Sequence, residues 1–171
     1  MEDLKRLVRD VPDFPKKGII FKDITPLIAD PKAYQKAINA FAKRYDNKGI
    51  DKIVSVEARG FLFGAPLAYG LGAGIVPVRK PGKLPFHTNR ISYELEYGTD
   101  SLDIHKDSIK KGEKILIVDD LLATGGTVAA VCKLVEQLEG KIIELAFLIE
   151  LGFLKGRDKL KGYSVFSLIR F

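Results

Sequence analysis

The chain has 171 residues, of which 46% are hydrophobic and 29% are charged, with a formal net charge of +6 and one cysteine. This size and composition predict a single globular domain over residues 1–171 and exclude an internal disulfide or a multi-cysteine metal site. The sequence shows no signal peptide and no apolar stretch long enough to span a bilayer, so we expect a cytoplasmic protein with no membrane partner. Basic and acidic residues interleave and there is no basic arm, so we expect no nucleic-acid partner.

The first half of the chain alternates between helical and extended patterns. Asp30 before Pro31 predicts an N-cap with proline in the first helical turn, and an apolar face at helical spacing continues until Gly49. Around this helix the pattern predicts a helix over 2–9, extended chain over 11–21, a strand over 51–56, a helix over 63–71 and a strand over 74–78.

The second half continues the alternation after an interruption. Residues 79–90 contain prolines, a glycine and several bases, which together predict a mobile loop. Beyond it we expect a hairpin of 91–97 and 101–106 around Gly98, strands over 115–118, 142–150 and 163–169, a helix from Val128 to Leu138, and a short helix near 154–160. The predicted fold class is α/β, with a mainly parallel twisted sheet flanked by helices.

The most informative motif joins an aliphatic strand to the helix that follows it. Asp119 and Asp120 end the aliphatic run, and a loop of small residues then leads from Ala123 to Thr127. Ligands of open α/β sheets bind at the carboxyl ends of strands. Gly125 and Gly126 let the backbone approach a ligand, and unpaired N–H groups at the helix start favour phosphate. Carboxylates accept hydrogen bonds from hydroxyls, so the motif predicts a ribose 5-phosphate site; the alternative is an ordinary turn with solvated carboxylates.

Two further groups of residues suit a second anion. The segment 57–60 also follows a predicted strand, at the same edge of the sheet, and the Arg59 guanidinium pairs well with phosphate oxygens. Arg79, Lys80 and Lys83 place three cations in the predicted mobile loop, as expected of a lid over a polyphosphate. The alternatives are a surface turn with a solvated arginine and an ordinary solvated charged face.

Other motifs carry less information. Residues 70–74 lack the third glycine of a dinucleotide-binding fingerprint, so a helix end is the better interpretation. His87 and His105 show no metal-ligand spacing and are given no role. Glu96 falls on the same strand face as Glu94, and this pattern alone indicates an ordinary exposed strand residue.

The stretch 115–127 resembles the phosphoribosyl pyrophosphate signature of the type I phosphoribosyltransferases. Further segments are similar in order and spacing to adenine-specific members of that family, and with the signature they extend over nearly the whole chain. They are FPKKGIIFKDITP at 14–26, EARGFLFG at 57–64, RKPGKLP at 79–85 and LEYG at 95–98. The resemblance implies the type I phosphoribosyltransferase fold, with a base-pocket and hood segment over 1–30 and a flexible lid loop over 79–90.

The resemblance also implies a reaction. A phosphoribosyl group would pass from phosphoribosyl pyrophosphate to N9 of adenine, giving AMP and pyrophosphate. Mg²⁺ would be held mainly through phosphoribosyl pyrophosphate, without a dedicated protein site. Family members are usually homodimers, so part of the hood would reach a neighbouring subunit's site.

The resemblance assigns roles to residues by their position in the motifs. Asp119 and Asp120 would accept the ribose hydroxyls and lie near the charge that develops on the sugar. The residues that would wrap the 5-phosphate are Ala123, Thr124, Gly125, Gly126 and Thr127. Those that would hold pyrophosphate are Glu57, Ala58, Arg59, Arg79, Lys80 and Lys83, with the peptide bond between the first two often cis. The adenine-binding residues would be Ile20, Phe21, Lys22 and Ala123.

Glu96 would be the acidic residue near the purine, with a part in catalysis. Lys22 departs from the family pattern, because arginine usually stands at this position. Two alternatives stay open. One is the same transfer to another base, such as hypoxanthine, guanine or xanthine. The other is a non-catalytic regulator of nucleic acid that senses phosphoribosyl pyrophosphate, although the motif segments leave no room for an appended nucleic-acid-binding module.

Overall fold

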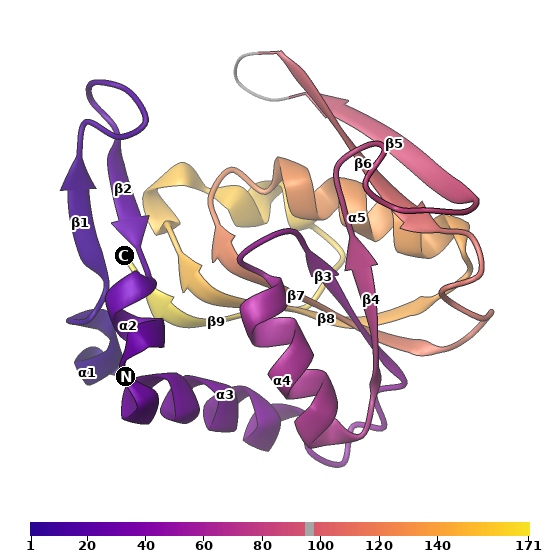
Figure 1. The fold of residues 1–171 in the computed structure, drawn as a ribbon, viewed down its shortest axis with the longest axis horizontal. Helices are drawn as coiled ribbons and strands as arrows, with labels where there is room; N and C mark the ends of the chain where they lie inside the picture. The colour runs from indigo at the N-terminus through magenta and orange to yellow at the C-terminus, as the bar shows by residue number, and fades with distance from the viewer. Residues whose placement is uncertain (95–97) are drawn as a thin grey trace.

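The computed structural model describes residues 1–94 and 98–171, and its centre is a five-stranded sheet (Figure 1). The strand order is β4-β3-β7-β8-β9, and all neighbouring strands run parallel. The strands are β3 (Lys52–Val56), β4 (Gly74–Val78), β7 (Lys114–Leu122), β8 (Lys141–Glu150) and β9 (Val165–Arg170). The predicted α/β fold with a mainly parallel sheet flanked by helices is confirmed.

Both faces of the sheet are buried, which explains why its inner strands are rich in aliphatic residues. Successive residues of β7 point to opposite faces, so Val118 packs into one core cluster and Ile117 into the other. Helices α3 (Pro31–Tyr45) and α4 (Phe61–Leu71) contribute to the first cluster, and α5 (Gly126–Gln137) contributes to the second. This double burial fixes the register of β7 and therefore the position of the residues at its carboxyl end.

Local sequence sets where the helices begin. Asp30 accepts hydrogen bonds from the backbone N–H groups of Lys32 and Ala33, and Pro31 occupies the first turn of α3, as predicted. Helix α5 begins differently, because its N-cap is Gly125, with a φ of 81° and no side-chain hydrogen bond. The first N–H groups of α5 therefore have no capping side chain, and this end of the helix is open to an anion.

Two antiparallel hairpins stand on either side of the carboxyl edge of the sheet (Figure 1). One pairs β1 (Arg9–Pro12) with β2 (Ile20–Asp23), and the other pairs β5 (Thr88–Glu94) with β6 (Thr99–His105). The predicted hairpin of 91–97 and 101–106 is confirmed over its described residues, although β5 begins inside the predicted loop and residues 95–97 lie outside the described part of the chain. Glu96 lies outside the described residues.

The short elements differ most from the predictions. The leading helix is only α1 (Glu2–Lys5), because the chain turns into β1 soon afterwards. Helix α2 (Thr25–Ala29) is not predicted, since five residues are too few to show helical spacing. The helix expected near 154–160 is a pair of 3₁₀ turns, η1 (Gly152–Leu154) and η2 (Gly156–Leu160). Within residues 1–94 and 98–171, no helix combines the length and the apolar character needed to cross a bilayer.

Candidate active site

The neighbouring strands β3 and β7 bring two of the predicted loops together. Ser55 of β3 is paired with Val118 of β7, so the residues that follow these two positions lie side by side. Arg59 reaches across this edge and places its Nη2 atom 2.7 Å from Oδ2 of Asp120. The prediction that both loops share one edge of the sheet is confirmed.

The loop between β7 and α5 forms the wall of a hollow. All five predicted phosphate-loop residues from Ala123 to Thr127 line it, together with Arg59, Asp119 and Asp120. Gly126 and Thr127 form the first turn of α5, whose backbone N–H groups favour negative charge. The hollow therefore offers an anion site directly beside two carboxylates.

The two carboxylates are held in surroundings that oppose their charge. Burial and the neighbouring Asp120 charge raise the pKa of Asp119 well above its usual range. Burial also raises the pKa of Asp120, but the Arg59 guanidinium counteracts this shift. The backbone N–H of Asp120 donates to Oδ1 of Asp119 at 2.9 Å. Hydrogen-bond donors on a ligand, such as a pair of vicinal hydroxyls, would stabilise the charged form of these carboxylates.

The same carboxylates fit a metal ion that is shared with a substrate. Oδ2 of Asp120 is buried and has no hydrogen-bond partner among the described residues, although the Arg59 guanidinium is close. Within residues 1–94 and 98–171, no cluster of three or more His, Cys, Asp or Glu side chains is arranged to hold a metal ion. Mg²⁺ prefers oxygen ligands and usually binds through one or two carboxylates plus substrate phosphates. The donor set therefore suits Mg²⁺ bound chiefly through a phosphorylated substrate.

A second hollow adjoins the first and shares Arg59, Asp119, Asp120 and Thr127 with it. Its other lining residues are Val56, Glu57, Ala58, Lys80, Tyr93, Asp100 and Leu102. The peptide bond between Glu57 and Ala58 is cis, as the resemblance implies. An anion in this hollow would meet the guanidinium of Arg59 and the ammonium of Lys80.

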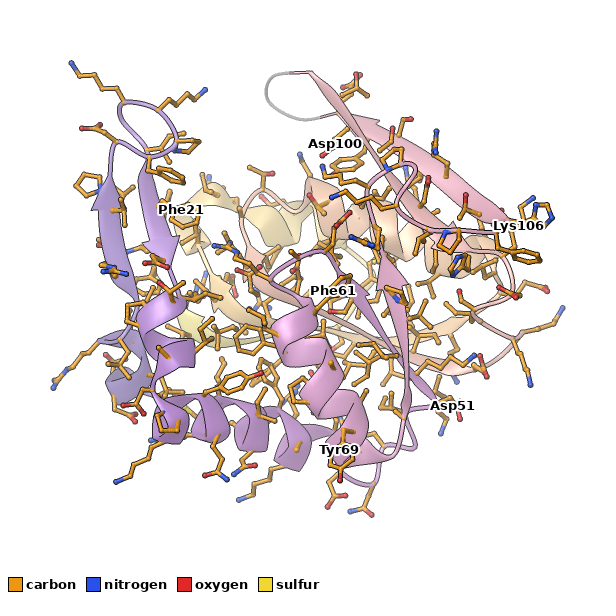
Figure 2. All side chains as sticks on the ribbon, in the orientation of Figure 1. Phe21, Asp51, Phe61, Tyr69, Asp100 and Lys106 are labelled. Carbon is orange, nitrogen blue, oxygen red and sulfur yellow. The ribbon has the colours of Figure 1, made fainter. Side chains whose placement is uncertain are left out.

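Carboxylates hold the three cations of the predicted lid. Nη2 of Arg79 lies 3.1 Å from Oε2 of Glu57, and Nζ of Lys83 lies 3.3 Å from the same atom. Lys80 donates its backbone N–H to Glu57 and its ammonium to Asp100, which Figure 2 labels on the β5–β6 hairpin. Burial opposes the charge of Glu57, but the hydrogen bonds hold its pKa below the usual range. Lys80 lines the second hollow while its ammonium is paired with Asp100, and Arg79 and Lys83 are paired with Glu57.

A third, apolar hollow lies on the other side of the phosphate loop. Its lining residues are Gly18, Ile19, Ile20, Thr124, Leu151, Phe153 and Leu154. Ile20 is 57% exposed, a high value for a large aliphatic side chain. Because Thr124 belongs to both hollows, a ligand could fill the apolar hollow and the phosphate loop together.

The other predicted base-binding residues lie elsewhere. Phe21 is on the opposite face of β2 from Ile20, and its ring centroid is 5.0 Å from the Arg59 guanidinium carbon. The ammonium of Lys22 donates to Asp10, its cross-strand partner, at 2.5 Å. Ala123 lines the phosphate hollow. The structure therefore brings Ile20 to the apolar hollow and leaves the ammonium of Lys22 bound to β1.

Several lining residues are not singled out by any sequence motif. Leu151, Phe153 and Leu154 follow β8, whose carboxyl end lies beside that of β7. Their place after a parallel strand is a signal that could have identified them. Tyr93 and Asp100 come from the β5–β6 hairpin, and no pattern in the sequence places them near β7.

The sequence and the structure both resemble those of known proteins. The family described as phosphoribosyl transferase domain matches residues 25–170. The adenine phosphoribosyltransferase of Geobacter metallireducens is 61% identical over 171 residues, which are 100% of both chains. The adenine phosphoribosyltransferase structure from Thermoanaerobacter pseudethanolicus is 59% identical, with a TM-score of 0.96 and coverage of 99% of each chain. That from Saccharomyces cerevisiae, complexed with an imino-altritol bisphosphate and adenine, is 47% identical, with a TM-score of 0.93 and coverage of 98% and 97%.

The matched region contains the whole parallel sheet, the carboxylate pair and the phosphate loop, so fold and site together define a phosphoribosyltransferase. Residues 1–24 lie outside this region but within the full-length similarity to the relatives. The chain belongs to the adenine phosphoribosyltransferase family.

Proposed function

We propose that this enzyme transfers the phosphoribosyl group of phosphoribosyl pyrophosphate to N9 of adenine, giving AMP and pyrophosphate. The observation that carries the proposal is the carboxylate pair of β7 beside the open N-terminus of α5, in a hollow that shares Thr124 with an apolar hollow. A ribose 5-phosphate has the matching order of groups, with an anion at one end and vicinal hydroxyls beside it. The adenine in the yeast relative's complex supports the choice of base.

The ribose 5-phosphate binds between the carboxylates and the phosphate loop. Backbone N–H groups of the loop from Ala123 to Thr127 and the hydroxyls of Thr124 and Thr127 hold the phosphate. Asp119 and Asp120 accept the ribose hydroxyls. The bond from C1 to the pyrophosphate oxygen breaks with its electron pair leaving on the pyrophosphate, so positive charge develops on the ring near both carboxylates.

The leaving group occupies the second hollow. Arg59, the backbone of Glu57 and Ala58, and Lys80 bind pyrophosphate, with Arg79 and Lys83 released from Glu57 as the loop closes. Mg²⁺, when bound, supplies further neutralisation of the developing pyrophosphate charge. These residues position and stabilise the leaving group and perform no covalent chemistry.

The base occupies the apolar hollow beside Thr124. Ile20 and Leu151 provide its apolar walls, and the backbone around Phe21 and Lys22 recognises the edge of the purine. N9 attacks C1, and Glu96 takes or shares the proton that the purine loses. If this is right, Glu96→Gln lowers kcat more than it weakens binding of phosphoribosyl pyrophosphate, and an unchanged kcat removes Glu96 from the chemistry.

We also infer that the enzyme is a homodimer in which residues 1–30 and 79–90 form the hood over the site. Exposed apolar side chains on α4 and the edge strand β4 support a protein–protein contact, with Tyr69 92% exposed and Ile75 43% exposed. Sedimentation equilibrium at micromolar concentration checks this expectation, and a monomer contradicts it.

A nucleobase panel tests the proposed function. Adenine, hypoxanthine, guanine and xanthine are each incubated with phosphoribosyl pyrophosphate, with Mg²⁺ or with a chelator, and nucleotide and pyrophosphate are quantified. The proposal predicts AMP and pyrophosphate in equal amounts from adenine, and loss of turnover with the chelator. Preference for another base contradicts the adenine assignment, and binding of phosphoribosyl pyrophosphate without turnover of any base favours a regulator.

A further inference from the structure

The segment after β8 lies directly behind the phosphate loop. It comprises η1 and η2, residues 152–160. Its side chains are mostly exposed, but Gly156 is buried and Leu160 is anchored in the core at 1% exposure. A buried glycine in an exposed turn indicates a close backbone contact.

That contact is with the phosphate loop itself. A Cβ atom placed on Gly156 would lie well under 3.0 Å from the carbonyl oxygen of Ala123, a distance that real Cβ atoms essentially never show. A Cβ on Gly125 would come equally close to the carbonyl oxygen of Gly156. Both obstacles are backbone atoms, which cannot move aside as a flexible side chain can. The two backbones therefore pack against each other with no room for a methyl group.

An ion pair between the exposed Arg157 and the buried Glu150 holds the segment in this place. Arg157 donates from Nε and Nη2 to the two carboxylate oxygens of Glu150, at 2.8 Å and 2.7 Å. Its Nη1 also donates to the carbonyl oxygen of Val165 on β9, at 3.1 Å. The side chain of Glu150 is 4% exposed and lies at the end of β8, where the backbone N–H of Leu151 donates to Leu122 of β7. The residue next to Gly156 is therefore fixed to the sheet by a planar, two-pronged interaction.

We propose that Gly156 is a positioning residue for the phosphate loop, held in place by Arg157 and Glu150. Its backbone supports the loop at Ala123 and Gly125 and so sets where the loop's N–H groups point. The inference rests on the proposed function, because it concerns the half of that site that takes the 5-phosphate. It predicts that disturbing Gly156 weakens binding of the ribose phosphate and leaves intact the pyrophosphate hollow, which is lined by neither Gly156 nor residues 123–126.

The test is isothermal titration calorimetry of Gly156→Ala with ribose 5-phosphate and, separately, with pyrophosphate and Mg²⁺. Gly140→Ala is the matched control, because a Cβ there would meet Val135, Ile115 and Ile109 side chains within 3.1 Å at the far end of α5. We expect Gly156→Ala to raise the Kd of ribose 5-phosphate by about tenfold or more and to leave that of pyrophosphate within about twofold. Gly140→Ala should leave both unchanged. Equal weakening of both ligands by Gly156→Ala, or of neither, overturns the proposal.

A second variant decides the matter if Gly156→Ala does not fold. Arg157→Met removes the two-pronged interaction, whereas Arg170→Met removes only the longer 3.6 Å contact with Glu150. We expect the first to weaken binding of ribose 5-phosphate selectively, by about threefold or more, and the second to have no effect. Identical binding by Arg157→Met and wild type overturns the proposal. Wild-type protein that binds neither ribose 5-phosphate nor phosphoribosyl pyrophosphate would contradict the proposed function itself.

Discussion

Replacement of Asp120 by asparagine isolates the contribution of one carboxylate to substrate binding. Asn has nearly the same shape, so the packing around the buried side chain is kept. Apart from its ion pair with Arg59, Oδ2 of Asp120 has no hydrogen-bond partner in the described structure, so it can accept one ribose hydroxyl. A hydrogen bond to a charged group contributes about 1.5–3 kcal/mol, and about 1.4 kcal/mol is a factor of ten. We therefore expect kcat/KM for phosphoribosyl pyrophosphate to fall between about tenfold and about 150-fold.

Stability should change far less than activity. Asp120→Asn loses the 2.7 Å contact with Arg59 but also relieves the repulsion that raises the pKa of Asp119, so the two effects oppose each other. The assay is steady-state kinetics with thermal unfolding measured in parallel, and Asp46→Asn, an exposed aspartate at the end of α3, is the control. A kcat/KM within about threefold of wild type would refute the role of Asp120, as would a loss explained by unfolding at the assay temperature.

Three further predictions concern pH, the base and stability. Because the pKa of Asp119 is raised, binding of phosphoribosyl pyrophosphate should weaken as falling pH protonates this carboxylate, at a higher pH than for an ordinary aspartate, and a flat titration by calorimetry would contradict this. Leu151→Ala should raise the KM for adenine by about tenfold through lost apolar contact, with the KM for phosphoribosyl pyrophosphate unchanged; equal effects on both would count against the base site. The carboxylate of Glu144 accepts from Nε and Nη2 of Arg44, at 2.7 Å and 2.8 Å, and its pKa is lowered to about 2. Glu144→Gln should therefore lower the free energy of unfolding by about 2 kcal/mol at neutral pH. This figure is smaller than the pKa shift alone would give, because Arg44 is partly exposed and solvent screens the pair. The difference in stability between variant and wild type should vanish as the pH falls from about 4.5 to about 2. Urea unfolding checks the last prediction, and a difference that persists at low pH would rule out the ion pair as its cause.

The parallel sheet could be predicted because strands that are buried on both faces appear in the sequence as runs of mostly apolar residues. Strand β7 contains four consecutive aliphatic residues, β8 is mostly apolar, and α3 has both a capping aspartate and a first-turn proline. The short elements have no comparable sequence pattern. Helix α2 is too short for periodicity, and the pairing of β1 with β2 depends on contacts across a loop rather than on any local pattern.

The same contrast holds for the site. The phosphate loop and the segment at 57–60 were predictable because each follows a parallel strand, and the carboxyl ends of neighbouring strands meet at one edge. The contacts of the loop cations were not predictable. Arg79 and Lys83 form ion pairs with Glu57, which is more than twenty residues away in the sequence. No local sequence pattern indicates that these side chains meet. Gly156 lies some thirty residues beyond the loop that it contacts, so only the folded chain brings the two together.

The most direct test of the whole site is a crystal structure of the enzyme with AMP bound. We expect the 5-phosphate to lie in the loop from Ala123 to Thr127 and the ribose hydroxyls to be within hydrogen-bond distance of Asp119 and Asp120. We also expect the purine to fill the apolar hollow between Ile20 and Leu151. A phosphate bound outside the loop, or a ribose that contacts neither carboxylate, would contradict the proposed site.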